Sequence, residues 1–259
     1  MRILGIIPAR MASSRFPGKP LAAILGTPMI GHVYLRSRMA GVLDDVYVAT
    51  CDEEVKEYTE SIGGRAIMTS DKHERASDRV AEALASIERE ARQKADIVVM
   101  IQGDEPMILP EMLDLAVQPM LTDENILVVN LMAPIRTREE YQDPNEIKVV
   151  VDNDSNALYF SREPIPSGKK HTGEIPMLKQ VCVIPFRRDF LIEFARLAST
   201  PLEKVESIDM LRVLEHGYRV KMVLTEFETY SVDTPEDLRS VEERMRKDPL
   251  VAEYTRPRA

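Results

Sequence analysis

Residues 6–21, IIPARMASSRFPGKPL, form the stretch that decides the fold. The apolar run over 3–7 predicts a short buried strand, and Pro8 ends it. The loop that follows combines small residues with the cations Arg10, Arg15 and Lys19. Small residues let backbone N–H groups approach phosphate oxygens closely, and cations neutralise the phosphate charge. The stretch therefore predicts a strand followed by an anion-binding loop, and an ordinary surface loop with solvated cations is the alternative.

This loop is neither a Walker A loop, which requires GxxxxGK[ST], nor the dinucleotide-binding GxGxxG motif. Its charge nevertheless favours anion binding. Residues 1–43 contain six Lys and Arg side chains and no Asp or Glu, whereas the whole chain has a formal net charge of −9. A cationic segment in an acidic protein is typical of a small anionic ligand. The acidic total argues against a nucleic-acid-binding protein.

Composition limits the class of protein further. A chain of 259 residues with 44% hydrophobic side chains can form one large α/β domain. The two cysteines, Cys51 and Cys182, have no metal-type spacing, so we expect reduced thiols in a cytoplasmic protein. We expect no signal peptide, because no long apolar segment precedes Pro8. No apolar run approaches the ~20 residues that a membrane span requires.

Strands and helices alternate in the first half of the chain, which predicts a doubly wound, mostly parallel sheet. Asp52 is expected to cap the second of the helices. After the first strand, the pattern predicts strands over 45–50, 66–68 and 96–101, and helices over 28–40, over 52–62 and from 77 onward.

The second half is less regular. The turn residues at 152–156 predict a hairpin, and 163–176 is expected to be a mobile loop. Two capping boxes, each of which begins with Thr-Pro, predict helix starts at Thr200 and Thr234, the latter for the last helix. The pattern predicts strands over 126–132, 147–151, 157–161, 180–185 and 218–225, and helices over 137–142 and 200–216.

Two carboxylates are placed where a metal ion could bind. Asp104 follows a buried strand directly, and Asp233 precedes the helix start at Thr234. Ligands of open α/β sheets bind at the carboxyl ends of strands. Two such carboxylates could hold one Mg²⁺ against triphosphate oxygens, with water in the other positions. The alternative is that both acids accept hydrogen bonds from backbone N–H groups at a helix entry.

The segment HERASDR, residues 73–79, gathers polar side chains just before a helix. Each one alone is expected to be solvated or to cap the helix, but together they could offer hydrogen bonds to a nucleotide base. The segment has no zinc-type spacing, and the chain offers no convincing Ser/His/Asp arrangement for a covalent mechanism.

Four stretches resemble the CMP-Kdo synthetases, which are 3-deoxy-manno-octulosonate cytidylyltransferases. The stretches are PARMASSRFPGKPL, QGDEPMI, NEIKVV with ALYFSR, and SVDTPEDL, and the resemblance extends over nearly the whole chain. It implies one α/β domain over 1–259 of the nucleotide-diphospho-sugar transferase type, with a smaller lobe at about 130–200 for sugar binding and dimerisation. It also implies a homodimer that uses CTP, Mg²⁺ and a sugar acid in surface polysaccharide synthesis.

The resemblance also implies roles for single residues. Arg10, Lys19 and Asp104 would be catalytic, and Asp104 and Asp233 would bind the metal. Arg162 would take the carboxylate of the sugar acid bidentately, in a substrate set completed by Gln102, Gln180 and Asp209. The nucleotide would contact Pro8, Ala9, Arg10, Ser13, Arg15, Lys19, His73, Arg75, Ser77, Asp78 and Arg79.

The chain departs from the family pattern in the base-binding and sugar-binding regions. HERASDR replaces the usual H-x-S-G-T-[ED]-R, and Gln180, Ile184 and Asp209-Met210 stand where the family has His, Tyr and Glu-Gln. Ile184 and Met210 each lack a hydrogen-bonding group. We therefore expect a sugar acid related to Kdo to be a better acceptor than Kdo itself. There are two alternatives. The protein could be a nucleotidyltransferase that uses another sugar acid or a sugar phosphate, or it could be a catalytically silent nucleotide-binding protein.

Overall fold

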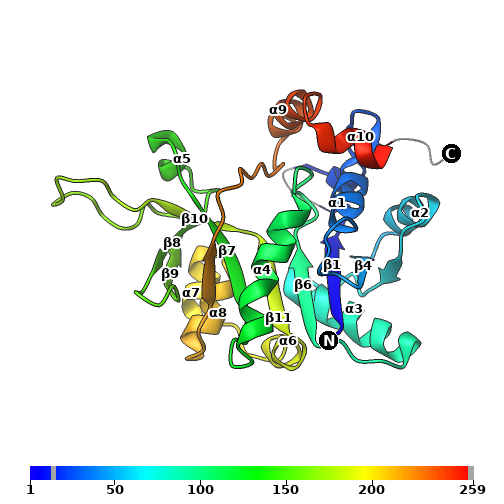
Figure 1. Ribbon diagram of the computed structural model, residues 1–259, viewed down its shortest axis with the longest axis horizontal. Helices are drawn as coiled ribbons and strands as arrows, with labels where there is room; N and C mark the ends of the chain where they lie inside the picture. The colour runs from blue at the N-terminus through cyan, green and yellow to red at the C-terminus, as the bar shows by residue number, and fades with distance from the viewer. Residues whose placement is uncertain (13–15, 256–259) are drawn as a thin grey trace. The chain divides into compact units, whose positions relative to one another are not determined.

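The computed structural model describes residues 1–12 and 16–255, and they form two compact units (Figure 1). The first unit contains Met1–Asp114 and the segment that begins at Thr229, and the second contains Leu115–Glu228. The lobe expected at about 130–200 lies within the second unit. No helix in the described part of the chain has the length and apolar character needed to cross a membrane.

The first unit has a parallel sheet, as the sequence predicts. Strand β1 (Ile3–Ala9) pairs with β4 (Asp45–Thr50) on one side and with β6 (Ile97–Ile101) on the other, and β4 pairs with β5 (Ala66–Met68). Every residue of β1 and β6 is buried, as expected of central parallel strands. The chain proceeds from β1 to β4 and β5 and then returns to the other side of β1, where it forms β6 (Figure 1). This reversal of strand order is where open α/β sheets bind ligands.

Helices connect these strands close to the expected bounds. They are α1 (Met29–Ser37), α2 (Glu53–Ser61), α3 (Ala76–Ala91) and α4 (Pro110–Thr122), which crosses in sequence from the first unit to the second. The expected cap by Asp52 is wrong, because its side chain makes no capping bond to α2. Its carboxylate instead accepts from the backbone N–H of Met11 at 2.7 Å.

Short elements and two further helices complete the first unit. A 3-10 helix, η1 (Lys19–Leu21), leads to the two-residue strands β2 (Ala23–Ile24) and β3 (Thr27–Pro28). Helix α9 (Pro235–Met245) starts with the predicted capping box between Thr234 and Asp237. It is not the last helix, because α10 (Pro249–Thr255) follows. A buried cluster joins these parts through Ile24, Met29, Val232, Val241 and Met245.

The second unit has a mixed sheet of its own, with strand order β12-β7-β10-β8-β9. The pair β12–β7 is parallel, and the other pairs are antiparallel. The hairpin predicted at 152–156 is confirmed as the connection of β8 to β9. The bounds of the strands are Lys221–Leu224 for β12, Val129–Pro134 for β7, Leu178–Val181 for β10, Lys148–Val151 for β8 and Ala157–Ser161 for β9.

Two predicted elements of the second unit are each divided in the structure. The strand expected at 180–185 is two strands, β10 and β11 (Val183–Arg187), separated at Cys182. The helix expected at 200–216 is also two, α7 (Pro201–Glu206) and α8 (Asp209–Glu215), separated at Ser207, which has a left-handed φ of 54°. The predicted capping box at Thr200 is present at the start of α7. The two other helices of this unit are α5 (Arg138–Gln142) and α6 (Arg188–Phe194).

Arg162 explains the break between α7 and α8. Its Nε donates to the carbonyl of Glu206 at 2.7 Å, and its Nη2 donates to the carbonyl of Ser207 at 3.3 Å. In a continuous helix these carbonyls would accept from N–H groups four residues later. A side chain that lies 44 residues earlier in the sequence thus replaces the helical partners.

Candidate active site

A cavity of about 300 Å³ lies at the carboxyl ends of β1 and β6 in the first unit. Gly103 allows the two strand ends to lie close together there, because a Cβ at this position would be 2.9 Å from the carbonyl oxygen of Pro8. The cavity is lined by Pro8, Ala9, Arg10, Lys19, Pro20, Met29, His73, Glu74, Arg75, Ala76, Arg79, Gln102, Gly103, Asp104 and Asp233. The structure therefore brings together the loop, the base segment and both acids that the sequence analysis singled out.

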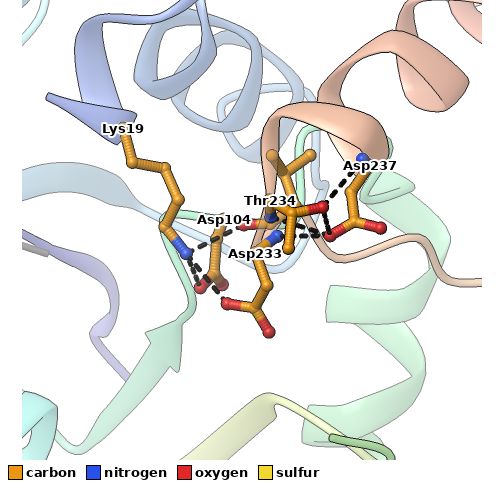
Figure 2. Close-up of polar contacts among 6 residues, drawn as sticks. Lys19, Asp104, Asp233, Thr234 and Asp237 are labelled. Atoms are coloured by element: carbon orange, nitrogen blue, oxygen red, sulfur yellow. Dashed lines mark hydrogen bonds and ion pairs between the residues drawn. The ribbon is translucent and has the colours of Figure 1, made fainter. Parts of the chain in front are cut away.

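Lys19 lies between the two acids (Figure 2). Its Nζ is 2.8 Å from Oδ2 of Asp104 and 3.3 Å from Oδ1 of Asp233, and it also donates to the carbonyl of Val232 at 2.8 Å. The three partners lie in the segments that follow β6 or precede α9, so the backbone of these segments positions them. The side chains of both acids keep about a quarter of their surface exposed and remain accessible from the cavity.

The capping box of α9 fixes the position of Asp233. The carboxylate of Asp237 accepts from the backbone N–H groups of Asp233 and Thr234, at 3.1 and 2.8 Å (Figure 2). The N–H of Val232 donates to the carbonyl of Asp104 at 2.9 Å, which joins the two acid-bearing segments directly. The backbone of the second acid is thus held by hydrogen bonds, and its carboxylate pairs with Lys19.

The two acids fit a magnesium ion that binds together with a nucleotide. Among the described residues, no group of three or more His, Cys, Asp or Glu side chains could hold a metal ion. Mg²⁺ does not require such a cage, since it is commonly bound by one or two carboxylates, substrate phosphates and water. Asp104 and Asp233 supply carboxylates at one edge of the cavity, and cations for the phosphates lie beside them.

Arg79 supplies an observation that points to a ligand. Its side chain lies on α3, lines the cavity and is only 2% exposed. Nη1 donates to Oγ1 of Thr69 at 2.5 Å, whereas Nη2 is buried and has no hydrogen-bond partner among the described residues. A buried guanidinium N–H without an acceptor costs about 1–3 kcal/mol or more. A bound molecule that offers an oxygen to Nη2 would remove this cost.

Comparisons with known proteins show the family of this chain. A family model described as "Cytidylyltransferase" matches residues 4–241. The chain belongs to the cytidylyltransferase family. It is 46% identical to the 3-deoxy-manno-octulosonate cytidylyltransferase of Geobacter metallireducens, and the match covers 95% of this chain and 98% of the relative. It is 45% identical to the protein of that name from Syntrophobacter fumaroxidans, over 93% of this chain and 96% of the relative.

Solved structures show the same fold. A CMP:2-keto-3-deoxy-manno-octonic acid synthetase complexed with CTP matches with a TM-score of 0.87 and 36% identity, over 96% of this chain and 100% of that one. A 4-diphosphocytidyl-2C-methyl-D-erythritol synthase from Anaerococcus prevotii matches with a TM-score of 0.62 and 12% identity, over 95% and 98%. At 12% identity, the similarity to this second structure shows a shared fold and nothing more. The α/β cytidylyltransferase fold predicted from the sequence is thereby confirmed.

Not all of the other residues predicted to contact the nucleotide line the cavity of this cytidylyltransferase. Ser77 and Asp78 lie in the first turn of α3 and do not line the cavity. His73 does line it, and its Nε2 is hydrogen-bonded to Glu82. Ser13 and Arg15 lie outside the described residues.

The predicted sugar contacts divide between the two units. Gln102 lines the cavity in the first unit. Arg162, Gln180 and Asp209 belong to the second unit. The guanidinium of Arg162 donates to three backbone carbonyls, and the Nε2 of Gln180 donates to Asn130 at 2.5 Å. Their roles toward a substrate remain predictions.

Ile184 and Met210 are the two positions on which the prediction of an acceptor other than Kdo rests. Both side chains are buried in the second unit. A buried side chain can still line a cavity, as the fully buried Met29 does in the first unit. The preference for another acid stays a prediction.

Glu74 lines the cavity between His73 and Arg75; it belongs to the polar segment 73–79 that the sequence analysis singled out, but not to the residues to which the resemblance gave a role. The sequence analysis missed the role of Asp52. Asp52 lies at the N-cap position of α2, and its sequence neighbours give no sign that its carboxylate binds the N–H of Met11, 41 residues away.

Proposed function

We propose that this protein transfers CMP from CTP to the anomeric hydroxyl of Kdo, or of a closely related sugar acid, and releases pyrophosphate in an Mg²⁺-dependent reaction. One observation carries the proposal: Lys19 lies between Asp104 and Asp233 beside a cavity that also contains a buried, partly unpaired arginine. The names of the relatives and of the CTP-bound neighbour support CTP and Kdo as the substrates.

The residues of the cavity suggest how the reaction is catalysed. The hydroxyl of the acceptor attacks the α-phosphorus, and pyrophosphate leaves. Lys19 and Arg10 neutralise the charge that grows on the α-phosphate and the leaving group. Mg²⁺ bound to Asp104 and Asp233 would draw charge from the phosphate oxygens and hold the triphosphate in position. Nη2 of Arg79 offers a hydrogen bond to the base or the ribose, which orients the nucleotide.

A pyrophosphate-release assay tests the proposed function. Kdo, other sugar acids and sugar phosphates are each supplied as acceptors with CTP, UTP, ATP or GTP, in Mg²⁺ and in excess EDTA. We expect release with CTP and Kdo in Mg²⁺ and no release in EDTA. Release that prefers a sugar phosphate or another nucleotide contradicts the assignment of substrates. Binding of CTP with no turnover of any acceptor would favour a catalytically silent nucleotide-binding protein.

We further propose that the protein acts as a cytoplasmic homodimer. Cys51 and Cys182 are free thiols, which is typical of a reducing compartment. Leu158 on the edge strand β9 and Val205 on α7 expose large apolar side chains in the second unit, as a subunit interface requires. Sedimentation equilibrium should give twice the mass of one chain, 29.4 kDa, and Leu158→Glu should weaken the dimer. A monomer at micromolar concentration contradicts this proposal.

A further inference from the structure

Helix α10 contacts α1 through a buried polar cluster that the proposed reaction does not use. His32 and Arg36 lie one turn apart on α1, and both are fully buried. Nδ1 of His32 is 2.8 Å from the hydroxyl of Tyr254 on α10, and Nε of Arg36 donates to the same hydroxyl at 3.1 Å. Arg36 also forms an ion pair with Asp248, just before α10. Asp248 and Tyr254 lie beyond the residues that match the family model.

The hydrogen bonds in this cluster have one consistent direction. Nε2 of His32 lies 2.8 Å from the carbonyl oxygen of Ile24, which can only accept, so Nε2 carries the proton. The hydroxyl of Tyr254 accepts from Arg36 and donates to the unprotonated Nδ1. Arg36 and Tyr254 thus select the tautomer of His32 that can bind Ile24. Burial and the charge of Arg36 lower the pKa of His32, which keeps the ring neutral.

The carbonyl that His32 holds belongs to the segment that carries Lys19. Ile24 follows η1 by three residues, and the N–H of Ala22 donates to the carbonyl of Lys19 at 3.1 Å. Ile24 also packs in the buried cluster that contains Val232, whose carbonyl accepts from Nζ of Lys19. The backbone carbonyl and the Nζ atom of Lys19 are therefore both hydrogen-bonded within the part of the first unit that surrounds Ile24 and Val232.

We propose that His32 is a positioning residue for Lys19, and that Tyr254 and Arg36 act through it by fixing its tautomer. His32 touches no cavity residue through its polar atoms; it holds the η1–β2 segment in the register at which Lys19 reaches Asp104 and Asp233. The effect on turnover rests on the proposed function, whereas the effect on the position of Lys19 does not. If the cluster only packed α10 against α1, its loss would lower stability and leave Lys19 in place.

The position of Lys19 can be measured without any activity. Lysines are acetylated with an N-hydroxysuccinimide ester, and the rate at each site is followed by mass spectrometry, with Lys56 on α2 as the internal reference. The variants are His32→Leu, His32→Gln and Tyr254→Phe. The matched control is Tyr218→Phe, which removes a hydroxyl that donates to Glu193 in the second unit. We expect Lys19 to react severalfold faster in His32→Leu and Tyr254→Phe, because its amine is no longer held by the two acids.

His32→Gln should restore slow acetylation, since the amide nitrogen of Gln can donate to the carbonyl of Ile24. With CTP and Kdo, kcat of His32→Leu and Tyr254→Phe should fall about tenfold or more while KM for CTP changes little. Tyr218→Phe should match the wild type in both measurements. Tyr254→Phe decides the question if His32→Leu fails to fold, because it removes one hydroxyl near the end of α10.

The two proposals fail in different ways. An unchanged acetylation rate of Lys19 in Tyr254→Phe and His32→Leu overturns the positioning role, whatever the activity. Faster acetylation of Lys19 with an unchanged kcat supports the positioning role and contradicts the role of Lys19 in turnover. A wild-type protein that releases no pyrophosphate from CTP contradicts the proposed function, and the acetylation rates still decide whether His32 positions Lys19.

Discussion

The amine of Lys19 donates to two carboxylates and one backbone carbonyl, and an ammonium group has three protons to give. Asp104 and Asp233 would repel each other at this edge of the sheet without a cation near both. Lys19 supplies that cation while the cavity holds no nucleotide. In the proposed reaction, the same amine would donate to phosphate oxygens.

Lys19→Ala is expected to lower kcat by about a hundredfold or more, because the growing phosphate charge loses its nearest fixed cation. The control is Lys56→Ala, which removes an exposed lysine paired with Glu53 on α2. Pyrophosphate release and thermal melting should be measured on both. Near-normal turnover in a folded Lys19→Ala protein contradicts the role of Lys19.

Asp104→Asn and Asp233→Asn should each abolish Mg²⁺-dependent turnover. If the two acids serve one ion, the double variant should lose little more than either single variant, since the ion is already gone. A double-mutant cycle on kcat measures this. Losses that simply multiply would show that the acids act independently.

At the scale of secondary structure, the close approach of β1 and β6 shapes the cavity. A methyl group at Gly103 would be 2.9 Å from the carbonyl oxygen of Pro8, and a backbone atom cannot move aside as a flexible side chain does. Gly103→Ala should therefore separate the strand ends that carry Arg10 and Asp104. We expect it to cost about 1–3 kcal/mol of unfolding free energy and to lower kcat.

Gly41→Ala is the matched control for Gly103→Ala. A Cβ at Gly41 would lie 3.9 Å from Oδ2 of Asp114, which is an ordinary van der Waals contact. Urea unfolding and kcat should be measured for both variants. Equal stability and equal activity would show that the strand ends tolerate a methyl group.

The elements of the first unit were predictable because their signals are local. A buried strand, a polar junction and an amphipathic helix each occupy neighbouring residues, and the order of the strands then brings Lys19, Asp104 and Asp233 together. The break at Ser207 was not predictable, because the residue that causes it, Arg162, belongs to another element. The burial of Ile184 and Met210 depends in the same way on tertiary packing. Local patterns thus predict which residues meet at the carboxyl ends of β1 and β6, but they do not predict which side chains of the second unit are buried.

For the whole molecule, acid should reduce stability through His32. Burial lowers the pKa of this side chain, and the groups that face it are Arg36 on its own helix and Tyr254 on α10, with Asp248 paired to Arg36. The unfolded chain protonates His32 below about pH 6.5, whereas the folded protein does not. The contribution of neutral His32 to the unfolding free energy is therefore intact above that pH. It is lost as the pH falls toward the lower pKa of the folded state.

The unfolding free energy should be lower at pH 5.5 than at pH 7.5 because of this residue. Urea midpoints of the wild type and of His32→Gln at the two pH values measure it, because the other histidines contribute equally to both proteins. An identical pH dependence in the two proteins would show that folding does not change the pKa of His32.

The pairing of Asp104 and Asp233 on one lysine also has a consequence for synthesis on the ribosome. At about 5–20 residues per second, Asp233 is made on the order of ten seconds after Asp104. During that interval the nascent chain contains the residues of β1, β4 and β6. Of the two acids that pair with Lys19, it contains only Asp104. The candidate active site therefore cannot be completed while the ribosome is still making the second unit.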